Sequence, residues 1–162
     1  MFEQFAADAR RVVMRAAEEE SQELGSSTIE AEHLLLAIAG DEHSPAGRLL
    51  ADSGLDPDGV HLALDRESER SLASVGVKTS DFHLPSRPSP ARRKPRLSAS
   101  AKLALERTAR HAVARRARHI TAADLLVGIL RADLGTVPRM LAVAEIDRVA
   151  LLTQAQRLVG TS

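Results

Sequence analysis

Apolar residues recur at three- and four-residue spacing along most of the chain, which is the period of an amphipathic helix. The first such stripe predicts a helix over about residues 6–24 and consists of Phe5, Ala9, Val12, Val13, Ala16 and Ala17. Further stripes predict helices at about 30–39, after Ser44-Pro45 and after Asp56-Pro57, since proline fits the first turn of a helix. The first part of the chain is therefore expected to be a unit of four short helices.

The stretch Ile29–Ile38 occurs twice, because Ile120–Ile129 matches it without a gap. The alignment places Leu34 on Leu125 and continues as far as Asp56 on Asp147. Self-similarity of this kind indicates a duplicated structural unit. We predict an all-α fold of two tandem four-helix repeats, at residues 1–70 and 97–162. The helices of the second repeat are expected to follow Ser98, Thr121, Thr136 and Asp147.

Residues 71–96 break the helical pattern with four prolines, several serines and the basic cluster Arg92-Arg93-Lys94. This composition predicts a flexible linker between the repeats. The basic cluster either binds an acidic surface or is simply solvated.

The formal net charge is zero, but it is unevenly distributed. Residues 1–70 hold 16 acidic and 6 basic side chains, and residues 71–162 hold 6 acidic and 16 basic ones. Two oppositely charged halves are expected to dock on each other. Binding of nucleic acid by the basic half is the less favoured interpretation, because no aromatic residues accompany the arginines to stack on bases.

Residue types that carry chemistry are scarce. Without cysteine, disulfides and thiolate sites are excluded, and neither a phosphate-binding P-loop nor an H-E-x-x-H metal motif occurs. The six histidines are scattered, and the serines lie in loops and helix caps. We expect no catalytic residues, no cofactor and no metal.

Neither a membrane-spanning apolar run nor a secretory signal pattern is present. We therefore expect a soluble cytoplasmic protein. With three Phe, no Trp and no Tyr, its core must be mainly aliphatic.

Two stretches, M-F-E-Q-F-A-A-D-A-R-R-V-V at Met1–Val13 and I-E-A-E-H-L-L-L-A-I at Ile29–Ile38, resemble the N-terminal domain of the ClpC and ClpA unfoldases. That domain is a duplicated four-helix unit with an I-G-T-E-H-I-L-L-G-L type signature in each half. In the unfoldases it receives substrates and adaptor proteins ahead of two ATPase rings. The resemblance thus implies a non-catalytic recognition module of the Clp proteolytic system. Such a chain would act as a regulator, adaptor or decoy.

In ClpC-type domains the glutamate of each E-H signature binds the guanidinium of phosphorylated arginine. The resemblance assigns this role to Glu32, with His33 beside it. The second signature reads Ala123-Asp124, so its carboxylate is displaced by one residue, which rotates it by about 100° around the helix. Glu32 has an alternative role, since an acid in the first turn of a helix stabilises the helix dipole.

The resemblance also implies a groove between the first helices of the two repeats, where cyclic-peptide antibiotics bind mycobacterial relatives. The matching positions are Phe2, Arg10, Val13, Leu97, Lys102 and Glu106. The family usually has phenylalanine in place of Leu97, so affinity for cyclic peptides is expected to be altered. For Phe2 the alternative is a cap over the local core.

The expected partners are therefore Clp-system proteins or their substrates and adaptors, with no membrane. The alternative function is binding of nucleic acid or acidic proteins through the basic second repeat, at Arg107, Arg110, Arg115, Arg116 and Arg118.

Overall fold

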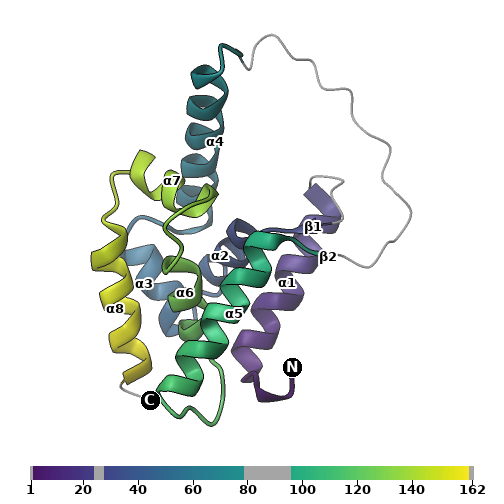
Figure 1. The fold of residues 1–162 in the computed structure, drawn as a ribbon, viewed down its shortest axis with the longest axis vertical. Helices are drawn as coiled ribbons and strands as arrows, with labels where there is room; N and C mark the ends of the chain where they lie inside the picture. Colours follow the sequence, from purple (N-terminus) through teal and green to yellow (C-terminus); the bar gives the residue numbers. More distant parts are fainter. Residues whose placement is uncertain (1, 24–27, 79–95, 161–162) are drawn as a thin grey trace.

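The computed structural model describes residues 2–23, 28–78 and 96–160. Within these ranges the chain forms eight α-helices, one 3-10 helix and two very short strands (Figure 1). The first repeat contains η1 (Phe2–Gln4), α1 (Ala7–Glu23), β1 (Thr28–Ile29), α2 (Ala31–Ala39), α3 (Pro45–Asp52) and α4 (Pro57–Ser74). The second contains β2 (Arg96–Leu97), α5 (Ala99–Ala114), α6 (Ala122–Leu130), α7 (Thr136–Val143) and α8 (Arg148–Gly160). The predicted fold of two four-helix repeats is confirmed.

Side-chain caps start most of the helices at the predicted positions. Ser44 Oγ accepts the Gly47 N–H at 2.9 Å, and an Asp56 carboxylate oxygen accepts the Gly59 N–H at 2.8 Å. Ser98 and Thr121 cap α5 and α6 in the same way. Each cap satisfies one of the N–H groups that the first turn of a helix leaves without an intrahelical partner. The helix starts were therefore readable from local sequence.

The two repeats share one hydrophobic core, with α2 and α6 at its centre (Figure 1). These helices bury nearly every side chain, and their largest fully buried residues are the leucines and isoleucines of the repeated signature. Phe5 is the one aromatic residue among the buried core side chains of the described chain. The core is thus mainly aliphatic, as composition predicts.

Backbone pairing joins the repeats through two equivalent contacts. The strands β1 and β2 pair in parallel, with Ile29 opposite Leu97. An isolated parallel bridge joins Phe5 to Ile120. In the alignment of the repeats Phe5 matches Leu97 and Ile29 matches Ile120, so each repeat makes the same contact with the other.

Helix caps are exchanged between the repeats as well. An Asp8 carboxylate oxygen on α1 accepts the Ala122 N–H of α6 at 3.0 Å. At the matching position of the second repeat, Ser100 Oγ on α5 accepts the Ala31 N–H of α2 at 3.1 Å. Ser100 Oγ also donates to a Glu30 carboxylate oxygen at 2.7 Å. The first helix of each repeat therefore caps the central helix of the other.

The predicted linker lies largely outside the described residues, which omit 79–95. At its start, α4 continues to Ser74, four residues past the predicted end of the first repeat. Arg92-Arg93-Lys94 falls in the omitted segment.

Candidate functional site

Glu32 lies in the first turn of α2 and lines a cavity of about 260 Å³ at the junction of the repeats. The opposite walls come from α5 and from the segment that leads into α7. Two of the wall residues are exposed leucines: Leu103 is 47% exposed and Leu134 is 89% exposed. Arg107 lines the same cavity. The cavity thus combines a carboxylate, an aliphatic rim and a cation.

The Glu32 carboxylate is half-buried and forms no ion pair with any residue of the described chain. Burial raises the pKa of its carboxyl group, and the nearby acids Glu30 and Glu67 raise it further. A hydrogen bond to its own backbone and the charge of Arg139 act in the opposite direction without cancelling the rise. A cationic ligand would relieve this unfavourable environment, because an opposite charge stabilises the ionised form.

His33, the neighbour of Glu32, has a structural role in the helix. Its Nδ1 accepts the Glu30 N–H at 2.8 Å, and the Glu30 side chain accepts the backbone N–H of His33 in return. This reciprocal capping box fixes the imidazole at the start of α2. A ligand contact of His33 stays a prediction.

The equivalent place in the second repeat lacks a free carboxylate. Ala123 occupies the position of Glu32 and is 8% exposed. Asp124 is fully buried, and its two carboxylate oxygens accept Arg115 Nε at 2.9 Å and Nη2 at 2.7 Å. Burial raises the pKa of Asp124, but the hydrogen bonds from Arg115 and Thr121 outweigh it and leave the pKa below its ordinary value. Asp124 therefore stabilises the start of α6, and the signature carboxylates of the two repeats differ in their partners.

A second cavity, of about 600 Å³, lies between the N-terminal segment and α5. It contains three of the predicted groove residues, Leu97, Lys102 and Glu106. Glu106 also pairs with Arg110 one turn along α5. The apolar walls include Phe5 and Ile120, which also form the cross-repeat bridge.

The other predicted groove residues are placed differently. Val13 is in the hydrophobic core and is only 9% exposed. The Arg10 side chain is exposed, and its Nε donates to the Phe5 carbonyl oxygen at 2.8 Å. Phe2 begins η1, but its side chain lies outside the described part of the structure. Neither Arg10 nor Val13 lines this cavity.

Sequence reasoning missed the leucine rim of the Glu32 cavity. Leu103 lies outside the buried stripe of α5 and is exposed. The helical period could have predicted this exposure from the sequence. Leu134 lies in the connection between α6 and α7, where periodicity carries no information.

The predicted basic face of the second repeat is partly neutralised. Arg115 forms an ion pair with Asp124, and Arg110 forms one with Glu106. Arg107, Arg116 and Arg118 form no ion pair with the described residues.

Within residues 2–23, 28–78 and 96–160, no helix is long and apolar enough to cross a membrane. The same ranges contain no cluster of three or more side chains suited to hold a metal ion.

A model of the Clp repeat (R) N-terminal domain matches residues 4–144, which is most of the chain. The chain belongs to the Clp N-domain family. This domain is a non-catalytic, substrate- and adaptor-binding module of Clp chaperones, and the ATPase of those proteins lies in other regions.

Among curated proteins, the chain is 28% identical over its full 162 residues to the chloroplastic chaperone protein ClpC of Pisum sativum, of which it covers 16%. It is also 28% identical over 160 residues to the chloroplastic ClpC1 of Arabidopsis thaliana, covering 99% of this chain and 15% of that protein. The chain thus spans about a sixth of the length of these relatives. Because they are chloroplast proteins, cytoplasmic location stays a prediction.

Two solved Clp N-domain structures have the same fold. The N-terminal domain of the chaperone ClpD from Arabidopsis thaliana aligns with a TM-score of 0.69 at 21% identity, over 99% of this chain and 97% of that chain. The Hsp104 N-terminal domain from Candida albicans aligns with a TM-score of 0.69 at 18% identity, over 98% and 93%.

Proposed function

We propose that this Clp N-domain recognises peptide segments through the cavity around Glu32. The cavity binds the guanidinium group of an arginine-derived side chain, and its specific ligand is phosphoarginine. The observation that carries the proposal is a half-buried carboxylate with a raised pKa and no ion-pair partner among the described residues, beside a leucine rim.

The chemistry of the cavity fits an arginine-derived side chain. A carboxylate binds a planar guanidinium through two parallel hydrogen bonds. The aliphatic stem of the ligand would pack on Leu103 and Leu134. A phosphoryl group on the guanidinium would carry negative charge, for which Arg107 in the same cavity is the suitable partner.

We assign the larger cavity of Leu97, Lys102 and Glu106 to extended or cyclic peptides, because it combines apolar walls with charged and polar groups at Glu3, Gln4, Lys102 and Glu106, as ligand sites commonly do. In this proposal the domain acts on the Clp system as a regulator, adaptor or decoy, by binding marked substrates or adaptor proteins.

An NMR titration of the ¹⁵N-labelled chain with a short phosphoarginine peptide tests the assignment. Shifts at Glu32, Leu103 and Leu134 that saturate at a lower concentration of the phosphoarginine peptide than of the unphosphorylated arginine peptide would support it. Shifts at Leu97 and Lys102 alone would place the peptide in the larger cavity. Shifts centred on Arg116 and Arg118, strongly weakened by salt, would favour the alternative function of binding acidic partners or nucleic acid.

A further inference from the structure

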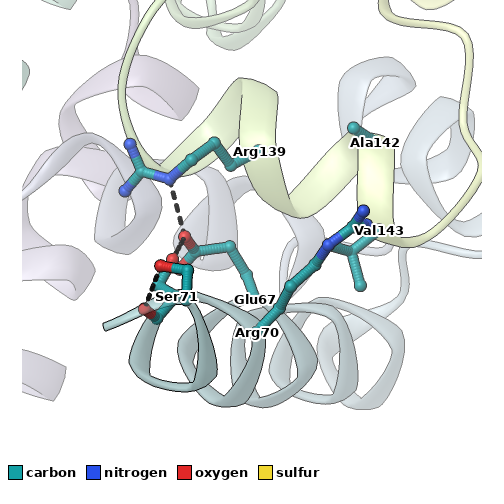
Figure 2. Close-up of a pocket in the computed structure, with 7 residues that line it drawn as sticks. Glu67, Arg70, Ser71, Arg139, Ala142 and Val143 are labelled. Carbon is teal, nitrogen blue, oxygen red and sulfur yellow. Dashed lines mark hydrogen bonds and ion pairs between the residues drawn. The ribbon is translucent and has the colours of Figure 1, made fainter. Parts of the chain in front are cut away.

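A third cavity, of about 300 Å³, lies between α4 of the first repeat and α7 of the second (Figure 2). It shares no lining residue with the cavity of Glu32 or with the larger cavity. Two arginines line it, Arg70 from α4 and Arg139 from α7, together with the small apolar residues Ala142 and Val143. Ser71 and Ser74 add hydroxyl groups from α4.

The one carboxylate in this cavity is already occupied. Glu67 is only 6% exposed, and its Oε1 accepts Arg139 Nε at 2.6 Å and Ser71 Oγ at 2.6 Å. Burial raises the pKa of Glu67, but the hydrogen bonds from Arg139 and Ser71 outweigh it, so the pKa lies below its ordinary value. Glu67 is therefore ionised at neutral pH and neutralises about one of the two arginines.

Arg70 supplies the remaining positive charge. It forms no ion pair or side-chain hydrogen bond with other described residues. In Figure 2 its side chain rises from α4 towards Val143, while Arg139 reaches Glu67 from the other side. The cavity thus presents a guanidinium that is unpaired among the described residues, next to an aliphatic wall.

The α4 wall of this cavity lies at the end of that helix. Arg70, Ser71 and Ser74 are all among the last five residues of α4, which rise above the rest of the bundle (Figure 1). The counterpart of Glu67 in the alignment of the repeats is Leu158, so the second repeat does not form the same ion pair.

From this geometry we infer a second recognition site, which binds an acidic side chain followed by an aliphatic one in a peptide segment. The carboxylate of the peptide pairs with Arg70. Its aliphatic neighbour packs on Ala142 and Val143. The site differs in charge from the Glu32 cavity, so it selects acidic segments where that cavity selects cationic groups.

The test is an NMR titration of the full chain with the capped peptide acetyl-Leu-Asp-Leu-Asp-amide, and with the same peptide carrying asparagine for aspartate. We expect the acidic peptide to shift the signals of Arg70, Ser71, Ala142 and Val143. In Arg70→Gln its affinity should fall roughly fivefold, the size of one partly exposed arginine–carboxylate contact. Arg66→Gln makes the same charge change one turn earlier on α4 and should leave the affinity unchanged.

Equal affinity for the asparagine peptide, or an equal loss in Arg66→Gln and Arg70→Gln, would overturn the inference, because either result means no specific contact at Arg70. The same shifts with inorganic phosphate, at an affinity equal to that of the acidic peptide, would overturn the peptide assignment in favour of a site for free oxyanions. Glu32→Gln should not weaken this binding, because it removes a negative charge that acts on Arg139 and Glu67. A failure of this site is therefore distinguishable from a failure of the proposed function, in which Glu32→Gln weakens binding.

Discussion

Glu32 and Asp124 are both carboxylates in the first turn of a central helix, but their surroundings differ. Asp124 is fully buried and held by Arg115 and Thr121. Glu32 lines a cavity. Burial and the neighbouring acids Glu30 and Glu67 disfavour its ionised form, and the backbone hydrogen bond and the charge of Arg139 do not cancel this effect. One residue of displacement along the helix thus separates a carboxylate that stabilises the fold from one that lines a cavity without an ion pair among the described residues.

Glu32→Gln should stabilise the unliganded domain at neutral pH. Because folding raises the pKa of this carboxyl group, its ionisation above the ordinary value of 4.5 costs folding stability. The variant removes that cost, so its Tm should exceed that of the wild type at neutral pH. Thermal unfolding followed by circular dichroism checks this, and the difference should vanish at pH values below 4.5. A lower Tm at neutral pH would mean that Glu32 has a stabilising partner.

Asp124→Asn should have the opposite effect. Folding lowers the pKa of Asp124, so its contribution is present above the ordinary value of 3.8 and is lost as pH falls through the folded value. At neutral pH the variant should lose roughly 2–4 kcal/mol in urea unfolding, because it breaks a buried ion pair and a capping box. Asp133→Asn is the control: Asp133 pairs with Arg148 but its side chain is 84% exposed, so its loss should be below about 1 kcal/mol. Equal losses in the two variants would contradict this account.

Part of the candidate site could be predicted from individual residues. The displacement of the second carboxylate follows from helical pitch, so the sequence alone indicated that Asp124 differs from Glu32. The capping role of His33 and the leucine rim could not be predicted, since both depend on how α5 and the segment before α7 pack against α2.

At the scale of elements, α5 and α6 approach closely because Gly128 has no side chain. A Cβ at this position would lie 2.0 Å from Thr108 Oγ1 and 2.6 Å from the Ala104 carbonyl oxygen. The backbone contact cannot be relieved by a rotamer change, so the helices would have to move apart.

Gly128→Ala should therefore destabilise the domain by about 1–3 kcal/mol, despite the better helix propensity of alanine. Urea unfolding measures the loss. Gly160→Ala, at the end of α8 where a Cβ would meet nothing within 4 Å, is the matched control. A stability of Gly128→Ala equal to that of the control would contradict the close packing of α5 and α6.

The helices themselves were predictable because their signals are local: apolar stripes, proline in the first turn, and the caps Ser44, Asp56, Ser98 and Thr121. The two-residue strands were not predicted, because so short a pairing leaves no periodic pattern. The exchanged caps Asp8 and Ser100 were also missed, since each joins residues far apart in the sequence.

At the scale of the whole molecule, the repeats form a single structure. They share the core, the paired strands, the exchanged caps and the Glu67–Arg139 ion pair. Among the described residues, the Glu67–Arg139 ion pair joins an acidic side chain of the first repeat to a basic one of the second, and docking driven by the opposite charges of the two halves stays a prediction. The cavities of Glu32, of Leu97 and of Arg70 each take residues from both repeats, so each proposed site exists only where the repeats pack together.

Ser100→Ala should loosen the start of α2 in the opposite repeat. The substitution removes the acceptor for the Ala31 N–H, and losing a capping side chain costs about 1 kcal/mol. Hydrogen exchange measured by NMR should show faster exchange at Ala31, with little change at the Ala122 N–H. Asp8→Ala should give the reverse pattern. Changes confined to the mutated helix would contradict the exchange of caps.

Calorimetric titration of a phosphoarginine peptide into the wild type, Glu32→Gln and Glu42→Gln tests the proposal that Glu32 is the ligand carboxylate of this Clp N-domain. Glu42 is an exposed acid beyond the end of α2 and lines none of the three cavities. The account predicts a loss of affinity of about 10- to 100-fold in Glu32→Gln, the size of a charged hydrogen-bonded contact, and an unchanged affinity in Glu42→Gln. Equal affinities in all three proteins would contradict it.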